Sequence, residues 1–267
     1  MREPFVIVRG AGDIATGTIY CLYKCGFKVL ALESKKPTAI RRLAAFCEAI
    51  YDGESTVEGV TAYRADGISD AERIMSDGGL PVMADEQAES IDMLKPDVVV
   101  DAMIAKRNLG TFKEMAPLTI GLGPGFTAGR DVHAAVETMR GHNLGRIIYD
   151  GSPMPNTGVP GVIAGFSSER VIHSPTEGQI KNISKIADIV TKGQEIAKIG
   201  NEAVYASIDG VLRGIIRDGY NVKKGMKIAD IDPRTEQVNN CTTISDKARC
   251  IAGSVLEIII ERRELWE

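Results

Sequence analysis

Long apolar runs are missing from this sequence, and none approaches the ~20 residues that a membrane-spanning helix requires. The first residues, from Met1 onward, run directly into a short apolar stretch and lack the layout of a signal peptide. An excess of positive charge is also missing, because 36 acidic residues outnumber 32 lysines and arginines. The net charge of −4 argues against a nucleic-acid-binding surface, which is normally basic. We therefore expect a protein that binds neither membranes nor nucleic acid.

Cysteine is scarce and shows no paired spacing. The sequence contains five cysteines and no C-x-x-C motif: Cys21, Cys25, Cys47, Cys241 and Cys250. An odd number without such a motif is typical of reduced thiols, and it predicts a cytoplasmic protein. Cys21 and Cys25 lie four positions apart in a predicted helix and could share a metal ion, but buried structural thiols are far commoner. We predict no metal site.

The most informative feature that is present is an internal repeat. Residues 172–199 and 204–231 align without a gap at an offset of 32 positions, so that Gly178 matches Gly210. A repeat of this kind defines an architecture before any single residue is interpreted. Each copy alternates apolar and polar residues around a turn glycine, which is typical of short half-buried strands. The two copies together predict a small all-β sandwich with pseudo-twofold symmetry.

The spacing of the repeat resembles the biotinyl/lipoyl domain, a doubled hammerhead with a barrel-sandwich fold. In that family a lysine at the hairpin between the two copies carries the cofactor. Here the corresponding hairpin, residues 200–207, contains no lysine, and the nearest one, Lys198, falls within a predicted strand. An amine must be exposed on a turn to be acylated by a partner ligase. We therefore predict a carrier-like fold without covalent biotin or lipoate.

The N-terminal segment reads as strand, glycine loop, helix and strand. An apolar strand is predicted at 5–9, a glycine loop at 10–17, a helix at 18–25 and a second strand at 28–33, with Gly26 ending the helix. This order predicts a Rossmann-like unit in a mostly parallel sheet, hence an α/β fold class.

The glycine loop fits the dinucleotide-binding pattern G-x-G-x-x-A through Gly10, Gly12 and Ala15. The first glycine permits a tight turn, and the second lets backbone amides approach a phosphate at the helix N-terminus. Glu33 lies where a ribose hydroxyl would be held. Asp13 is expected to cap the helix, although its charge opposes a bound phosphate. The alternative is that the glycines only allow close packing of helix and strand.

The remainder of this half continues as alternating strands and helices. Helices are predicted at 38–48 and 69–75, and strands at 59–64, 81–83 and 96–103. Three polar residues follow the last of these strands: Lys106, Arg107 and Asn108. Residues just beyond the carboxyl end of a parallel strand lie at the ligand-binding edge of the sheet, so we expect these three to face a ligand.

A second glycine loop follows the predicted strand at 118–122 and is expected to open a helix at 132–140. Its candidate ligand-binding residues are Gly123, Gly125, Arg130 and His133. Exposed backbone amides at a helix N-terminus, next to a fixed guanidinium, favour an anion. The alternative is a sharp turn with an exposed arginine and a capping Asp131.

The C-terminal residues predict a helix at 248–261 with Ser245 as its N-cap. We expect this helix to pack back on the first half, which would bring Lys247 and Arg249, as basic walls, to one cleft shared with the two glycine loops. The predicted organisation is a Rossmann-like domain at 1–150, an ordered connector at 151–166, the β-repeat at 167–235 and a C-terminal helical segment at 236–267.

Four motifs together resemble the YqeB family: G-A-G-D-I-A-T-G, G-L-G-P-G-F-T-A-G-R-D-V-H-A-A-V-E-T, P-N-T-G-V-P-G and I-S-D-K-A-R. The N-terminal half is also similar in kind to the Rossmann part of XdhC-type accessory factors. The resemblance implies an accessory protein of a selenium-dependent molybdenum hydroxylase, with the apo-hydroxylase or other maturation factors as partners. A molybdopterin-type ligand would then be handled in the cleft.

Two classes of function remain open at this point. One is a maturation factor that binds a nucleotide or pterin phosphate, and the other is an NAD(P)-dependent oxidoreductase. The sequence has no Tyr-x-x-x-Lys after the dinucleotide loop and no paired histidine and carboxylate in one segment. The absence of a constellation for hydride transfer favours the maturation factor.

Overall fold

The computed structural model describes residues 4–266 and divides into two compact units. The sheet unit comprises residues 1–37, 45–157 and 244–267. The repeat unit comprises residues 38–44 and 158–243. The predicted α/β class is confirmed for the sheet unit. Its boundaries differ from the predicted ones because residues 38–44 and the segment before the C-terminal helix belong to the repeat unit.

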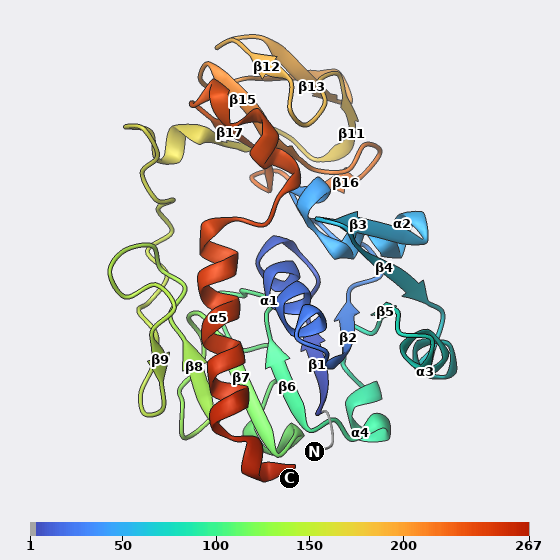
Figure 1. Cartoon of the computed structure of the whole chain (residues 1–267). Helices are drawn as coiled ribbons and strands as arrows, with labels where there is room; N and C mark the ends of the chain where they lie inside the picture. The colour runs from blue at the N-terminus through green and yellow to red at the C-terminus, as the bar shows by residue number, and fades with distance from the viewer. Residues whose placement is uncertain (1–3, 267) are drawn as a thin grey trace. The chain divides into compact units, whose positions relative to one another are not determined.

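The sheet unit is built on one nine-stranded sheet with the order β3-β4-β5-β2-β1-β6-β7-β8-β9 (Figure 1). The strands are β1 (Phe5–Arg9), β2 (Lys28–Glu33), β3 (Glu54–Val57), β4 (Val60–Ala65), β5 (Leu80–Ala84), β6 (Val98–Asp101), β7 (Leu118–Leu122), β8 (Ala134–Val136) and β9 (Ile147–Ile148). The seven strands from β4 to β8 in this order are parallel, and only the edge strands β3 and β9 are antiparallel.

The central strands are short runs of β-branched residues, which suit a parallel sheet covered on both faces. All four residues of β6 are buried, as are the last four of β1. The chain leaves β1 in one direction along the sheet, through β2 and β5, and later returns on the other side as β6 and β7. The strand order therefore reverses between β1 and β6, which is the position where ligands bind to open parallel sheets.

Two helices lie side by side in front of the sheet in Figure 1, α1 (Asp13–Lys24) and α5 (Asp246–Glu261). They pack so closely that a Cβ at Gly17 would lie 2.7 Å from the Cβ of Ala248. Ser245 caps α5 as predicted, because its side chain accepts a hydrogen bond of 3.2 Å from the Ala248 amide. The prediction that the C-terminal helix packs on the first half is thus confirmed.

The other helices of the sheet unit are α2 (Ala49–Asp52), α3 (Ile68–Ser76) and α4 (Ser90–Leu94), with a 3₁₀ turn at Lys113–Met115. Ile74 of α3 and Ile91 of α4 belong to one buried apolar cluster with Ile7 and Leu30 of the sheet. Within residues 4–266, no helix combines the length and the apolar character needed to cross a bilayer.

Two predicted helices are wrong. Residues 134–136 form strand β8 instead of a helix, since this segment is continuously buried and extends the sheet alongside β7. Residues 38–48 form only two 3₁₀ turns, Arg42–Ala44 and Phe46–Glu48. The first part of this segment instead packs on the repeat unit, where a Cβ at Gly214 would lie 2.6 Å from the Ile40 carbonyl oxygen.

The repeat unit contains two four-stranded sheets, β10-β17-β15-β12 and β14-β13-β11-β16, and every pairing within them is antiparallel. The first copy supplies β10 (Val171–His173), β11 (Gly178–Asn182), β12 (Ile189–Val190) and β13 (Glu195–Ile199). The second supplies β14 (Glu202–Tyr205), β15 (Gly210–Ile215), β16 (Asn221–Val222) and β17 (Lys227–Asp232). Each sheet takes two strands from each copy in equivalent order, so the predicted pseudo-twofold arrangement is present.

Equivalent residues of the two copies have the same burial and the same backbone conformation. Ile180 and Leu212 lie in the shared core, and each is at most 1% exposed. Gly178 and Gly210 have φ angles of 142° and 152°, a conformation that side chains disfavour. The unit is completed by 3₁₀ turns at Ser168–Arg170 and Thr235–Thr242.

Candidate functional site

The loops that follow the parallel strands meet at one edge of the sheet unit, as the topology predicts. A Cβ at Gly10, after β1, would lie 3.2 Å from the backbone of Met103, after β6. A Cβ at Gly125, after β7, would lie 2.9 Å from the backbone of Asn108. The loops after β1, β6 and β7 are therefore in direct contact. We call this edge the carboxyl edge.

The two glycines of the first loop have different roles. Gly10 has a φ of +99° and is enclosed by the chain after β6, so the fold itself requires a glycine there. Gly12 has an ordinary φ of −71°, and an added Cβ would meet no atom within 4 Å. Neither backbone conformation nor packing explains Gly12. Its open face leaves the start of α1 accessible to another molecule.

Gly12 is the N-cap of α1, and no side chain accepts a hydrogen bond at this cap. The expectation that Asp13 caps the helix is therefore wrong, because Asp13 is the first residue of the helix itself. Ala15 is buried within the first turn. An uncapped N-terminus leaves amide donors available to an anion.

Glu33, at the end of β2, turns toward the glycine loop. One carboxylate oxygen accepts a hydrogen bond of 2.9 Å from the Ala11 amide, and the other accepts one of 2.7 Å from the Ser34 amide. The carboxylate thus occupies one amide of the loop that a phosphate could otherwise use. A ligand at this edge would meet Glu33 as an acceptor for hydroxyl or amino groups.

A buried ion pair supports the loop after β6. Arg9 and Asp101, at the ends of β1 and β6, approach to 3.7 Å, and their side chains are 5% and 1% exposed. Thr111 joins them, accepting from Arg9 and donating to Asp101 over 2.6 Å. Burial raises the pKa of Asp101, against the opposing effects of Thr111 and Arg9. Neither residue was a predicted site residue, although each ends an apolar strand.

The same loop holds the predicted polar triplet. Asn108 exchanges two hydrogen bonds with the Thr111 backbone, of 2.6 and 2.8 Å, and so shapes the loop. Lys106 and Arg107 are exposed. Ile104 has a φ of +53°, which is unfavourable for a β-branched residue and marks local strain beside the glycine loop.

Glu137 and Thr138 follow β8 and also lie at the carboxyl edge. They were not predicted site residues, because a helix was predicted at these positions. Glu137 and Thr138 are 3% and 4% exposed. Glu137 accepts hydrogen bonds of 2.7 Å from the amides of Met139 and Met154. A Cβ at Gly123 would lie 2.6 Å from the Thr138 hydroxyl, which places the loop after β8 against the loop after β7.

Lys247 joins this edge from the first turn of α5. Burial lowers the pKa of Lys247, and the charge of Arg140 lowers it further, whereas Asp13 and Glu137 act in the opposite direction. Lys247 lies between Asp246, which Arg140 of the loop after β8 binds, and Ala248, which packs against Gly17 of α1, so the first turn of α5 adjoins both elements. The edge therefore carries acidic groups, Glu33 and Glu137, as well as the expected basic Lys247.

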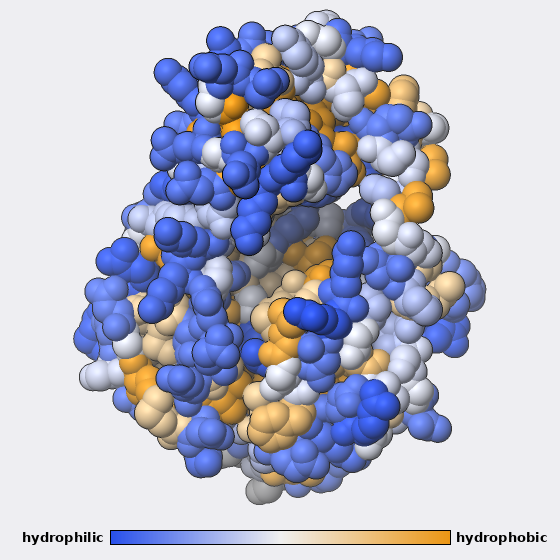
Figure 2. Space-filling model, turned by 180° about the vertical axis from the view of Figure 1, so that it is seen from behind, coloured by the Kyte–Doolittle hydropathy of each residue, from blue (hydrophilic) through white to orange (hydrophobic). Residues whose placement is uncertain are grey.

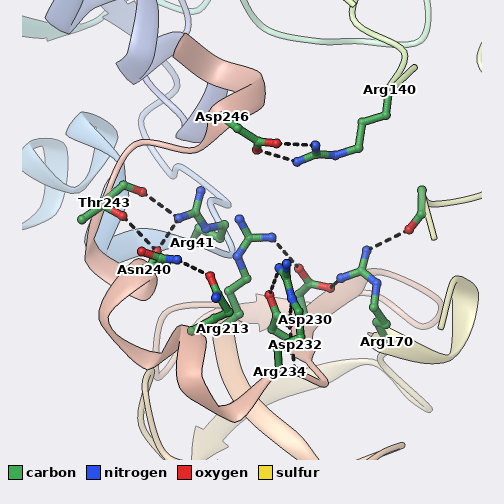
Figure 3. Close-up of polar contacts among 12 residues, drawn as sticks. Arg41, Arg140, Arg170, Arg213, Asp230, Asp232, Arg234, Asn240, Thr243 and Asp246 are labelled. Carbon is green, nitrogen blue, oxygen red and sulfur yellow. Dashed lines mark hydrogen bonds and ion pairs between the residues drawn. The ribbon is translucent and has the colours of Figure 1, made fainter. Parts of the chain in front are cut away.

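A bidentate ion pair fixes the start of α5 to the same region. Arg140 donates to both carboxylate oxygens of Asp246, over 2.8 and 2.9 Å (Figure 3). Such paired contacts hold both groups in one orientation. The contact ties the loop after β8 to the helix that carries Lys247.

Three predicted site residues lie elsewhere. The Arg130 side chain is 75% exposed and pairs at 2.9 Å with its neighbour Asp131, which also accepts from the Thr127 amide. Without a helix after it, this loop has no helix N-terminus to offer an anion. Arg249 binds Glu58 and lies over the ring of Tyr20. Since residues 247 and 249 are about 200° apart around a helix, only Lys247 can face the edge.

His133 is at the opposite end of the sheet. Its Nδ1 accepts a hydrogen bond of 3.0 Å from the Thr119 amide, beside the start of β7. Burial lowers the pKa of His133, and the charge of Lys113 adds to this effect. The residue therefore acts as a neutral acceptor that joins β7 to the segment before β8. The prediction that His133 lies in the first turn of a helix beside the second glycine loop is wrong.

The face of the sheet unit turned away from α1 and α5 shows apolar surface, drawn in orange in Figure 2. Large exposed apolar residues from segments on either side of β6 include Met93 at 65%, Leu109 at 46% and Phe112 at 51%.

Among residues 4–266, no group of three histidine, cysteine or carboxylate side chains is arranged to hold a metal ion.

Comparison with known proteins gives one informative match. The uncharacterized protein YqeB of Escherichia coli strain K12 is 51% identical over 255 residues, which span 96% of this chain. The identity supports membership of the YqeB family. The match covers 47% of that relative, so the chain spans about half its length. No protein-family model matches the chain.

Solved structures give only distant similarity. The ectoine utilization protein EutE (DoeB) of Ruegeria pomeroyi, in its product-bound form, aligns with a TM-score of 0.27 and 9% identity, over 86% of this chain and 85% of that one. A succinylglutamate desuccinylase/aspartoacylase of Rhodobacter sphaeroides aligns with a TM-score of 0.28 and 13% identity over the same shares. Values this low carry no argument about fold or function.

Proposed function

We propose that this chain is an accessory protein that binds a phosphorylated ligand, a nucleotide or pterin phosphate, at the carboxyl edge of the sheet unit. The observation that carries the proposal is Gly12. A glycine that neither backbone conformation nor packing requires, at an uncapped helix N-terminus, is accounted for by a ligand that approaches the backbone closely.

The surroundings of Gly12 support a ligand with both phosphate and hydrogen-bond donors. The order of the strands reverses between β1 and β6, beside this glycine. The ammonium of Lys247 supplies positive charge nearby, and the start of α5 lies at the same end as the start of α1 in Figure 1. Glu33 supplies an acceptor for hydroxyl or ring amino groups. Ribose nucleotides and pterin phosphates present both kinds of group.

The resemblance to the YqeB family carries the biological part of the proposal. It implies a cytoplasmic role in the maturation of a selenium-dependent molybdenum hydroxylase, with a molybdopterin-type ligand and the apo-hydroxylase as partner. The doubled hammerhead of the repeat unit, like a biotinyl/lipoyl domain, would then be a structural module. The hairpin between the copies turns at Gly200 and Asn201, while Lys198 pairs with Glu195 at 3.4 Å. This supports a module without covalent biotin or lipoate.

An NAD(P)-dependent oxidoreductase is the second candidate. Glu33 lies at the end of β2, where Rossmann enzymes hold the ribose. Its carboxylate, however, is already engaged by the Ala11 and Ser34 amides. The carboxyl edge brings together Asp13, Glu33, Glu137 and Lys247, and the sequence has no Tyr-x-x-x-Lys after the dinucleotide loop for hydride transfer. Maturation remains the favoured proposal.

The test is ligand-dependent thermal stabilisation with NAD, NADP, GDP and CDP. A ligand at 100 times its Kd stabilises the folded state by about 2.7 kcal/mol. Gly12→Val should abolish that stabilisation, because its side chain fills the open face of the loop. Gly67→Val is the matched control, since Gly67 also precedes a helix and an added Cβ there would meet no atom within 4 Å.

If Gly12→Val binds as tightly as the parent protein, the ligand site is elsewhere. If NAD or NADP alone stabilises the protein, the oxidoreductase proposal gains over the maturation factor. Co-purification with an apo-hydroxylase of the same organism, compared with its metal-loaded form, tests the partner.

A further inference from the structure

A pair of thiols lies near the end of α1, remote from the glycine loop at its start. Cys21 is half-buried and Cys25 is exposed. The Cys25 amide donates to the Cys21 carbonyl over 3.0 Å, so the turn between the two residues is closed and both side chains leave the same side of it. The expectation that these are buried structural thiols fails for Cys25, which packs into no core.

Two neighbouring thiols can form a disulfide or bind one metal ion together, and these two outcomes require different distances. Side chains four residues apart on a helix have their Cβ atoms about 5–6 Å apart. A disulfide requires about 3.5–4.5 Å between the same atoms, so it would strain or unwind the turn. An ion bound at about 2.3 Å from each of two sulfurs can instead bridge thiols that do not touch, so it requires no close approach of the Cβ atoms. The closed turn therefore favours chelation over a disulfide.

We propose that Cys21 and Cys25 form a two-thiolate binding site for a soft, thiophilic cation, of which copper(I) is the representative. Thiolates are the ligands that select such ions. Two protein ligands suit a cation that accepts linear coordination. This proposal goes beyond the ligand site at the carboxyl edge and does not depend on it.

The reaction is a ligand exchange without a change of oxidation state. One copper(I) ion forms two copper–sulfur bonds as its bonds to bicinchoninate and two S–H bonds break, and the free chelator and two protons pass to the solvent. The product, two thiolates and one monovalent cation, carries one negative charge. The guanidinium of Arg249 acts on Cys21 in the direction that favours its thiolate. Because both thiols must lose their protons to bind the ion, binding should strengthen as the pH rises.

The chain provides its own control in Cys250, an exposed single cysteine on α5. Its sulfur donates to the Leu144 carbonyl over 3.4 Å, and it has no thiol neighbour of its own in the structure described. Copper(I) held by isolated surface thiols would be lost equally on removing Cys250 or Cys25. Copper(I) held by the pair depends on Cys25 alone.

The experiment is anaerobic titration of the reduced full chain with copper(I) against the competing chelator bicinchoninate, with native mass spectrometry for stoichiometry. We expect one copper(I) per chain. Cys25→Ser should lower the affinity by more than about 100-fold, since even residues behind a metal ligand cost 10–100-fold. Cys250→Ser should bind copper(I) like the parent protein.

Equal binding by Cys25→Ser and the parent protein would overturn the proposal, as would an equal loss in Cys250→Ser. Rapid formation of a Cys21–Cys25 disulfide with a small disulfide reagent, detected by peptide mass, would also overturn it, because the geometric argument would then be wrong. Because Cys25 is exposed, its serine variant should keep the parent melting temperature, which is measured alongside.

Discussion

The two sheets of the repeat unit have equivalent strand orders but different outer faces. In the first copy, Lys181 and Lys198 are exposed. Their equivalents in the second copy are Arg213, whose side chain is 16% exposed, and Asp230, at 8%. A duplicated sequence has thus produced one solvent-facing sheet and one whose polar face is covered.

The covered face is held by arginines. Figure 3 shows the guanidinium groups of Arg170 and Arg213 on either side of Asp230. Arg41 donates to the carbonyls of Asn240 and Thr243 over 2.9 and 2.8 Å, and so binds the segment 38–44 to the last 3₁₀ turn of this unit. The symmetry of the sequence thus determines the strands, whereas segments outside the repeat determine which face is buried.

The largest expected effect comes from the buried ion pair of the covered face. Arg170 and Asp230 lie 2.9 Å apart with side chains 7% and 8% exposed. Arg170→Met should reduce the free energy of unfolding by about 3–5 kcal/mol, because it leaves a buried carboxylate without its closest partner. Urea denaturation measures the loss. The matched change on the open sheet, Lys198→Met, breaks an exposed pair and should cost no more than about 1 kcal/mol. Similar losses in both variants would remove the distinction between the faces.

The second effect tests the contact between the repeat and segment 38–44. Gly214→Ala places a Cβ 2.6 Å from the Ile40 carbonyl oxygen, which is backbone and cannot move alone. We expect a loss of about 1–3 kcal/mol in unfolding free energy, as for overpacked cores. The equivalent position in the first copy is Asn182, which already carries a side chain. A variant Gly214→Ala that is as stable as the parent would show that segment 38–44 is not held by this contact.

The smallest effect is a dependence of stability on pH. Burial alone would raise the pKa of Asp232, but hydrogen bonds from Arg234 and the charges of Arg234 and Arg213 hold it below its usual value. The lowered pKa stabilises the folded state above the unfolded value of about 3.9, and this contribution is lost as the pH falls through the folded value.

The difference in unfolding free energy between the parent protein and Asp232→Asn should therefore shrink as the pH is lowered from about 5 to about 2. Denaturation at a series of pH values measures it. Glu202→Gln, at an exposed position of the open sheet, controls for the loss of one negative charge. A difference that stays constant with pH would contradict the assignment.

Much of the fold could be predicted from the sequence because local pattern and tertiary structure agree there. The strand at 118–122 is observed with the predicted limits, and the repeat at 172–231 gives two equivalent sets of strands. The helix predicted at 132–140 is wrong. The alanines and glutamate of this segment favour a helix locally, but contact with the sheet makes it strand β8. β7 accepts a further parallel partner, and a continuously buried run of small residues supplies one.

The candidate site was predicted in part for the same reason. Gly10, Gly12 and the loop at 106–108 follow strands that the sequence identifies, so topology places them at one edge. Arg9 and Asp101 look like ordinary strand ends in the sequence, and only the adjacency of β1 and β6 makes them a pair. Glu137 was hidden by the wrong helix. Tertiary packing determines which side of α5 faces the edge. The sequence alone therefore could not distinguish Lys247, which faces it, from Arg249, which does not.

The sheet unit is made of three separated stretches of chain, and this has a consequence for its synthesis. The strands are complete once residue 157 has been made, but α5, whose Ala248 fits against Gly17, begins only at Asp246. At about 5–20 residues per second, a ribosome needs several seconds to make the intervening stretch. During that interval the repeat unit can fold as it emerges. The sheet unit is still incomplete, because the side of α1 that α5 covers remains exposed. At that stage the nascent chain exposes the surface of α1 that α5 later covers, and such transient exposure is where aggregation begins.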